Sequence, residues 1–261
     1  MNTVSSKDGT TIAYDKAGSG PAVVLVDGAL CYRAFGPMGE LAKLLAPNFT
    51  VYTYDRRGRG ESSNGKAFAV EREVEDIEAL IQAAGGSAFV FGTSSGACLA
   101  MEAAARLGKK IRKLAMYEAP YNSDKSLRQE WTDYRRQLAE TLSAGRRGDA
   151  VVLFMKLVGT PAEMVEGMRS SPMWPMFEAV APTLEYDAAE IGLDRATPVA
   201  QAARVSAPAL VMNGTAIPFM LVTAQELAKA MPQARQRTLE GQRHDVDLNV
   251  LAPELVQFFS K

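Results

Sequence analysis

Short, continuous apolar runs recur along the chain, each bounded by glycine, proline or charged residues. Such runs are typical of strands buried on both faces of a parallel sheet. Segments between them place apolar residues at helical spacing, as from Val70 to Ile81 ahead of Gly85. The pattern predicts strands over 22–26, 49–54, 87–92, 111–120, 207–214 and 234–241. It predicts helices over 70–84, 94–107, 224–232 and 252–260.

The N-terminal segment has a different pattern, in which polar and apolar residues alternate around Asp8 and Gly9. Alternation around such a dipeptide predicts a β-hairpin, which adds antiparallel strands at one edge of the sheet. The later strands alternate with helices, and parallel strands need crossovers of that length. We therefore predict an α/β fold with a mostly parallel central sheet and helices on both faces.

Residues 121–195 interrupt this alternation, because they are rich in helix formers and show no strand pattern. A segment of that size is too long for a plain loop, so we predict a helical cap inserted into a core of residues 1–120 and 196–261. The cap would cover the carboxyl edge of the sheet, where α/β folds bind ligands. A peripheral packing subdomain is the alternative. Met and aromatic residues favour an apolar pocket lined by Trp131, Met155, Met173, Trp174, Phe177 and, from the core, Ile217.

Composition excludes several classes of function. The formal net charge of −1 gives no basic field for nucleic acid. We expect no signal peptide and no membrane span, and therefore a cytoplasmic protein with Cys31 and Cys98 as free thiols. The single histidine, without a Cys/His cluster, predicts no metal site, and no glycine-rich dinucleotide motif follows the first buried strand. We expect no cofactor, and the pattern leaves the oligomeric state open.

The strongest chemical motif is Gly92-Thr93-Ser94-Ser95-Gly96, which lies between a predicted strand and a predicted helix. A sharp strand-to-helix turn strains its central residue and leaves no room for side chains two positions away, which explains both glycines. The turn would expose the Ser94 hydroxyl above the sheet, close to the N–H groups of the helix that starts at Ser95. We predict that Ser94 is a nucleophile. The alternative is that Ser94 only caps the helix.

A serine nucleophile needs a base, and His244 is the only histidine in the sequence. It follows the last predicted strand and precedes the last helix. The carboxyl ends of parallel strands meet at one edge of the sheet, which is also where Ser94 emerges. His244 is therefore predicted to be the general base.

These segments, in this order, resemble the α/β-hydrolase fold superfamily over essentially the whole chain. The matching pieces are "VVLVDGA", "YDRRGRGES", "GTSSG", the cap insertion and "GQRHDV". Within the superfamily the chain is most similar to small cap-bearing esterases, lactonases, perhydrolases and haloalkane dehalogenases. The resemblance implies an oxyanion hole formed by the backbone N–H groups of Ala29 and Ser95. The charged turn "DRRGRGES" is interpreted as structural rather than as a phosphate site.

Two positions depart from the family pattern. Asp27 stands where the family usually has histidine before Gly28, and Ile217 stands where the family's commonest catalytic aspartate follows the fifth buried strand. Glu118 is the best substitute, because some haloalkane dehalogenases place their acid after the same strand. The alternatives are that Glu118 caps the next turn or pairs with a cap arginine. Weaker candidates for the acid, which could equally cap the last helix, are Asp245 and Asp247.

The residue at the elbow selects among the reactions of the superfamily. Dehalogenation needs a carboxylate there, whereas Ser94 suits acyl transfer through a covalent intermediate. We therefore predict hydrolysis of small to medium apolar esters or lactones, with a small molecule as the only partner. Perhydrolysis, C–C bond cleavage and a lyase reaction use the same constellation and stay open. A ligand-binding protein that has lost turnover is the alternative of a different class.

Overall fold

A computed structural model describes residues 2–65 and 67–261 of the chain. Its centre is one eight-stranded sheet with the order β1-β2-β4-β3-β5-β6-β7-β8. In this order the six strands from β4 to β8 run parallel, while β2 pairs antiparallel with both β1 and β4 at one edge. The predicted mostly parallel α/β fold is therefore confirmed. The strands are β1 (Asn2–Ser5), β2 (Thr11–Ala17), β3 (Ala22–Val26), β4 (Thr50–Tyr54), β5 (Ala88–Thr93), β6 (Ile111–Tyr117), β7 (Ala209–Asn213) and β8 (Ala234–Thr238).

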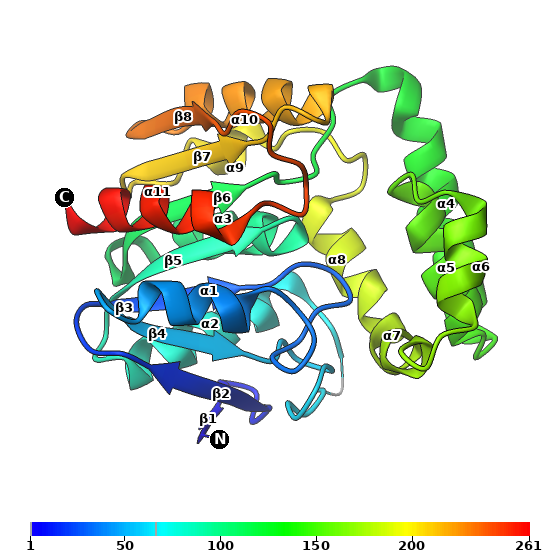
Figure 1. Cartoon of the computed structure of the whole chain (residues 1–261), viewed down its shortest axis with the longest axis horizontal. Helices are drawn as coiled ribbons and strands as arrows, with labels where there is room; N and C mark the ends of the chain where they lie inside the picture. Colours follow the sequence, from blue (N-terminus) through cyan, green and yellow to red (C-terminus); the bar gives the residue numbers. More distant parts are fainter. Residues whose placement is uncertain (1, 66) are drawn as a thin grey trace.

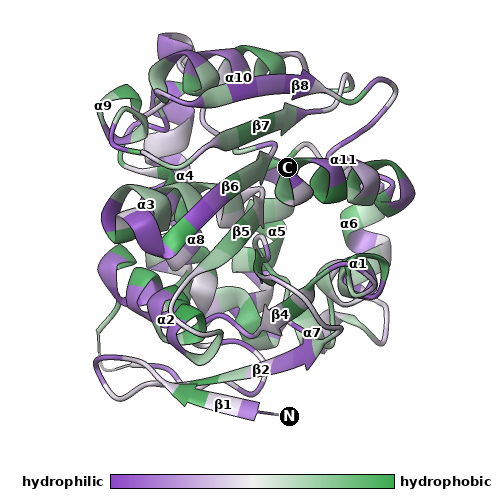
Figure 2. Cartoon of the chain, turned by 90° about the vertical axis from the view of Figure 1, so that its left-hand side faces the viewer, coloured by the Kyte–Doolittle hydropathy of each residue, from purple (hydrophilic) through white to green (hydrophobic). Residues whose placement is uncertain are grey.

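The predicted hairpin joins β1 to β2, with Ser5 opposite Thr11 and a left-handed Gly9 (φ 85°) in its turn. The continuous apolar runs are buried as expected, and every residue of β7 is buried. At the other edge, β8 alternates exposed and half-buried residues, and Figure 2 shows it largely in the hydrophilic colour. A polar edge strand of this kind is a poor template for pairing with another sheet.

Helices cover both faces of the sheet (Figure 1). One apolar cluster packs α1 and α11 against one face, and a larger cluster packs α2, α3, α9 and α10 against the other. These helices are α1 (Met38–Leu45), α2 (Val70–Ala83), α3 (Ser95–Leu107), α9 (Val199–Ala202), α10 (Pro218–Ala230) and α11 (Leu248–Ser260), with a short 3₁₀ turn at Gly108–Lys110.

Several boundaries differ from the prediction. Helix α11 begins at Leu248 rather than at 252, because the carboxylate of Asp247 accepts a hydrogen bond from the Asn249 N–H at 2.8 Å and caps it. Pro253 lies inside the helix. Strand β6 ends at Tyr117, before the predicted end at 120, because Glu118 takes a left-handed backbone conformation. Helix α1 was not predicted.

The predicted cap, residues 121–195, contains helices α4 to α8 and no strand, and every one of its residues is described. Figure 1 shows α4, α5, α6 and α7 standing beside one end of the sheet, with α8 leading back toward it. Helix α8 packs against α3, the helix that follows Ser94. These helices are α4 (Arg128–Ser143), α5 (Arg147–Leu157), α6 (Ala162–Arg169), α7 (Trp174–Val180) and α8 (Leu184–Ile191), with 3₁₀ turns at Lys125–Leu127 and Ala181–Thr183.

No helix in residues 2–65 and 67–261 combines the length and the hydropathy that crossing a membrane requires. Cys31 and Cys98 are free thiols, as predicted.

Candidate active site

The turn between β5 and α3 holds Ser94 in a strained conformation, with φ 55° and ψ −131°. The flanking glycines are required by the packing around it. A Cβ atom on Gly92 would lie 2.2 Å from the carbonyl oxygen of Gly96, and one on Gly96 would lie 2.4 Å from the carbonyl oxygen of Val26. The Ser94 side chain makes no N-cap hydrogen bond, so the turn does not use it as a cap. Its geometry is that of a nucleophile elbow.

The ladder between neighbouring strands brings Glu118 to the same edge as Ser94. The Ser94 N–H donates to the Tyr117 carbonyl oxygen at 3.0 Å, and the Glu118 N–H donates to that of Met212 at 3.0 Å. Glu118 is itself left-handed, with φ 47°, a conformation that costs energy for a residue with a side chain. Strained backbone conformations cluster at functional sites, and here two of them occur at the ends of neighbouring strands.

The side chain of Glu118 is buried and both of its oxygens are engaged. Oε1 accepts a hydrogen bond from the Gly214 N–H at 2.9 Å, and Oε2 lies 2.7 Å from Nδ1 of His244. A carboxylate at Nδ1 favours the tautomer that carries its proton there, which leaves Nε2 free to accept a proton. Glu118 therefore contacts the only histidine, and it neither caps the next turn nor pairs with a cap arginine.

The loop that carries His244 is fastened to the end of β7. The Gln242 carbonyl oxygen accepts from the N–H groups of Thr215 at 3.0 Å and Ala216 at 3.3 Å, and the Tyr117 hydroxyl donates to the Arg243 carbonyl oxygen. The His244 side chain is 40% exposed, so solvent reaches it. These bonds fix the backbone that leads into the imidazole.

The other carboxylates weighed for the acid do not reach the imidazole. Asp245 is 85% exposed and pairs with Arg243 at 3.4 Å, and Asp247 caps α11. Ile217 stands half-buried at the N-terminus of α10, so its position supplies no acid. Glu118 is the carboxylate that the fold brings to His244.

The loop after β3 lies directly against the elbow. A Cβ on Gly28 would lie 3.0 Å from the Cβ of Ser94 and 3.6 Å from its Oγ, so the backbone approaches the hydroxyl closely. Leu30 in this loop is left-handed, with φ 61°. Within residues 2–65 and 67–261 the Ala29 N–H donates to no protein acceptor. The Ala29 N–H is thus free to donate to a group placed beside Ser94.

Asp27 is buried at the base of this loop. Burial raises its pKa from 3.8 to about 6, although the Gly28 N–H donates to Oδ1 at 2.9 Å and favours the charged form. A Cβ on residue 36 would lie 2.5 Å from Oδ2 of Asp27, so only glycine at this position leaves room for the carboxylate. The Gly28 amide donates to this carboxylate, and the charges of Arg59 and Arg56 also favour its ionised form.

The charged turn after β4 carries three buried arginines, and each pairs with carboxylates. Arg57 binds Asp76 through two nitrogens, and Arg56 binds Glu73 in the same way. These pairs account for the charges of the turn without a phosphate.

The sequence predicted none of the carboxylates that pair with these arginines, and one of them, Asp187 of α8, also contacts the elbow. It accepts hydrogen bonds from Arg56, Arg59 and the hydroxyl of Ser95. No spacing signal could have found it, because 92 positions separate it from Ser95.

The residues predicted to line a pocket fall into two groups. An apolar cluster in the cap includes Leu30 and, packed against it, Ala29 of the loop beside Ser94. Met173 is 47% exposed and lies outside this cluster, as does Ile217. The predicted pocket residues inside the cluster are Trp131, Met155, Trp174 and Phe177.

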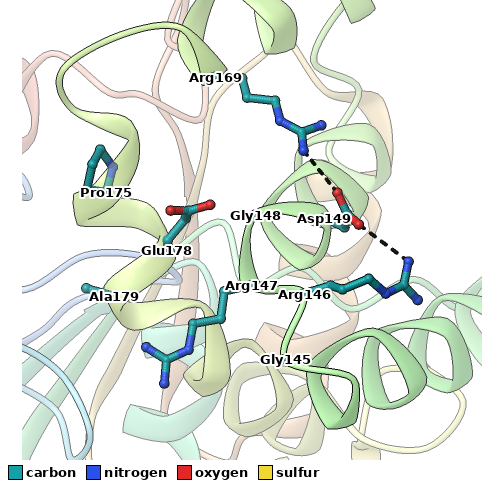
Figure 3. Close-up of a pocket in the computed structure, with 9 residues that line it drawn as sticks. All are labelled: Gly145, Arg146, Arg147, Gly148, Asp149, Arg169, Pro175, Glu178 and Ala179. Carbon is teal, nitrogen blue, oxygen red and sulfur yellow. Dashed lines mark hydrogen bonds and ion pairs between the residues drawn. The ribbon is translucent and has the colours of Figure 1, made fainter.

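A cavity of about 620 Å³ lies between α5 and α7, away from the elbow. Figure 3 shows its polar wall, where Asp149 pairs with Arg146 at 3.4 Å and Arg169 at 3.2 Å. A second cavity of about 300 Å³ lies between α3 and α8. Neither is lined by Ser94 or His244, so neither is the candidate site. Among the described residues no group of three or more His, Cys, Asp or Glu could hold a metal ion.

A profile of the alpha/beta hydrolase family matches residues 18–256. The chain belongs to the α/β-hydrolase family. The resemblance seen in the sequence assigned a nucleophile to Ser94, an acid to Glu118, a base to His244 and an oxyanion hole to the loop after β3. In the fold these residues lie at one edge of the sheet.

Similar proteins are consistent with this family assignment. An alpha/beta hydrolase from Sphaerobacter thermophilus is 52% identical, with a TM-score of 0.89 over 99% of this α/β hydrolase and 100% of that chain. An enol-lactonase from Burkholderia xenovorans is 22% identical, with a TM-score of 0.69 over 100% of both chains, which shows a shared fold. YraK, an uncharacterized hydrolase of Bacillus subtilis, is 32% identical over 114 residues, which span 42% of this chain and 41% of YraK. The match to that curated relative thus covers about two fifths of its length.

Proposed function

We propose that this α/β hydrolase is a serine hydrolase that cleaves small to medium apolar carboxylic esters or lactones through an acyl-enzyme on Ser94. The observation that carries the proposal is the 2.7 Å contact between Glu118 and His244, on the sheet edge where Ser94 is held in a strained turn. A serine, a base and an acid that orients the base are the parts that acyl transfer needs.

The proposed reaction assigns one role to each group. Nε2 of His244 takes the proton of the Ser94 hydroxyl as Oγ attacks the carbonyl carbon. The electrons of the C=O bond move to its oxygen, which the N–H groups of Ala29 and Ser95 stabilise. Protonated His244 then gives its proton to the leaving alcohol, and water repeats the sequence on the acyl-enzyme. Glu118 keeps the imidazole in the productive tautomer and stabilises its charge.

The proposed substrate class is supported by the apolar residues around the proposed oxyanion hole. Ala29 and Leu30 pack with an apolar cluster of the cap, in which the rings of Phe35 and Phe177 meet edge to face at 5.0 Å. An apolar acyl or lactone ring suits these surroundings better than a charged group.

The test is hydrolysis of p-nitrophenyl esters from acetate to decanoate by the wild type and by Ser94→Ala. We expect the wild type to prefer one chain length and the variant to lose about 10³-fold or more of kcat, because no other nucleophile replaces the hydroxyl. Ser143→Ala, which removes an exposed hydroxyl at the end of α4, is the control and should keep the full rate. Folded wild type that hydrolyses none of these esters would favour a ligand-binding protein instead.

A further inference from the structure

Asp187 is a buried carboxylate of the cap that contacts three groups of the core. Oδ1 accepts from the Ser95 hydroxyl at 2.7 Å, from Arg56 at 2.8 Å and from Arg59 at 2.9 Å, and Oδ2 accepts from Arg59 at 2.9 Å. Its side chain is 4% exposed. The residue belongs to α8 and its carboxylate reaches the elbow, so it joins the cap to the candidate site.

The first connection concerns Ser95, whose backbone N–H is one proposed oxyanion donor. Ser95 is the first residue of α3, and its N–H has no intrahelical acceptor. The hydrogen bond from its hydroxyl to Asp187 restrains the residue from the cap side. The direction of the N–H therefore depends on where Asp187 holds the side chain.

The second connection concerns Ala29, whose N–H is the other proposed donor. This N–H and the Gly28 carbonyl belong to one planar trans peptide, in which they point in opposite directions. Arg59 donates to the Gly28 carbonyl oxygen at 2.6 Å through Nη1, while its Nη2 is held by both oxygens of Asp187. Fixing the carbonyl on one side of the peptide fixes the N–H on the other.

The two connections meet in one side chain. We propose that Asp187 is a positioning residue through which helix α8 of the cap sets both N–H donors of the oxyanion hole, so that the hole is complete only while α8 is docked on the core. The inference rests on the proposed function, because it concerns how the same site is assembled. It makes the cap a part of the catalytic machinery in addition to a cover for the substrate.

Glu190 provides a matched control on the same helix. It is buried and pairs with Arg56, as Asp187 does, but it contacts neither Ser95 nor Arg59. If both residues only held the cap on the core, substitutions at Asp187 and Glu190 would have similar effects on catalysis. If Asp187 positions the oxyanion hole, only its substitution should lower kcat.

The experiment compares Asp187→Asn with Glu190→Gln in kcat and KM for a p-nitrophenyl ester and in the inhibition constant of an alkyl trifluoromethyl ketone. Addition of Ser94 to that ketone transfers the hydroxyl proton to His244 and leaves an oxyanion in the hole, so its affinity reports the two donors. Asp187→Asn should lower kcat about 10²-fold and weaken the ketone by a similar factor, with KM nearly unchanged. Glu190→Gln should keep all three constants close to those of the wild type.

Equal constants for Asp187→Asn and the wild type would overturn the inference, and so would equal losses in both variants. If Asp187→Asn does not fold, Ser95→Ala carries the test, because it removes the hydroxyl and keeps the N–H. A loss of kcat and of ketone affinity in Ser95→Ala supports the inference, and unchanged constants overturn it. Failure of the wild type to hydrolyse any ester would instead overturn the proposed function, so the two failures are distinguishable.

Discussion

Oε2 of Glu118 lies 2.7 Å from Nδ1 of His244, although 126 positions separate the two residues in the chain. The contact exists because β6 and β7 are neighbours, and the loop after β8 folds back over the end of β7. An acid placed after β6 therefore reaches the same imidazole that an acid after β7 would reach. The aliphatic side chain of Ile217 does not leave the histidine without a partner.

Replacing Glu118 by glutamine tests this relocation. The amide side chain would keep an acceptor for the Gly214 N–H but would lose the charge beside the imidazole and favour the wrong tautomer. We expect kcat for a p-nitrophenyl ester to fall about 10³- to 10⁴-fold while KM changes little. Asp245→Asn, at an exposed carboxylate next to His244, is the control and should keep the wild-type rate. Wild-type turnover in Glu118→Gln would exclude Glu118 as the acid.

The second prediction concerns the stability of variants in which an elbow glycine is replaced by alanine. Gly92→Ala places a Cβ 2.2 Å from a backbone oxygen that cannot move away, whereas a Cβ on Gly167 in α6 meets no atom within 4 Å. We expect Gly92→Ala to lower the free energy of unfolding by about 1–3 kcal/mol or more. Gly167→Ala should raise it by up to about 1 kcal/mol, because alanine favours the helix. Urea unfolding measures both, and equal values for the two variants would contradict the packing argument.

The buried carboxylate of Asp27 predicts a pH dependence of stability. Its pKa is raised by burial from 3.8 to about 6, so the folded state holds the proton more tightly than the unfolded chain. The resulting stabilisation is full below pH 3.8 and is lost as pH rises through 6. Two pKa units correspond to about 3 kcal/mol.

Asp27→Asn removes this titration and keeps an oxygen that accepts from the Gly28 N–H. Relative to the wild type, the variant should gain about 3 kcal/mol in free energy of unfolding between about pH 4 and pH 8. Denaturant unfolding at a series of pH values measures the difference. A difference that is constant with pH would show that Asp27 titrates normally in the fold.

A pair of buried glutamates beside Arg56 gives a fourth prediction. Burial alone would raise the pKa of Glu73, but the positive charge of Arg56, together with hydrogen bonds to Glu190 and Arg56, outweighs burial and lowers the pKa to about 2. Burial, with Glu73 nearby, raises the pKa of Glu190 well above its ordinary value. The surroundings therefore favour the charged form of Glu73 and disfavour that of Glu190.

Glu73→Gln should consequently cost about 3–5 kcal/mol of unfolding free energy at pH 7, because it leaves the buried Arg56 short of a counter-charge. Glu190→Gln should cost much less, because burial and the nearby Glu73 already disfavour the charged form of Glu190. As pH rises, the wild type loses the stabilisation of protonated Glu190, so Glu190→Gln should gain relative to it. Equal losses in both variants at pH 7 would refute this assignment of the charge.

Much of the fold could be predicted from local patterns. The apolar runs marked the inner strands, because a strand buried on both faces must be continuously apolar. Gly92 and Gly96 marked the elbow, because backbone atoms within 2.4 Å of a Cβ leave no alternative to glycine at either position. A single histidine limited the choice of base to one residue. Each of these signals is contained in a few consecutive residues or in a count.

What could not be predicted depends on contacts between distant segments. Asp187 is an ordinary acidic residue in a helix until the fold places it between Ser95 and Arg59. The start of α11 was predicted at 252, whereas the hydrogen bond from the Asn249 N–H to Asp247 sets it at Leu248. An exposed methionine of the cap, Met173, has the same composition signal as the buried Met155. Composition alone does not give the direction of a side chain.

The proposed function requires Ser94 to be an activated nucleophile. The most direct measurement is to incubate the folded protein with a fluorophosphonate probe and to locate the adduct by peptide mass spectrometry. We expect one adduct per chain, on Ser94, which is absent from Ser94→Ala and forms more slowly in Glu118→Gln. If the folded wild-type protein takes up no probe, or carries it on a different serine, Ser94 is not the nucleophile.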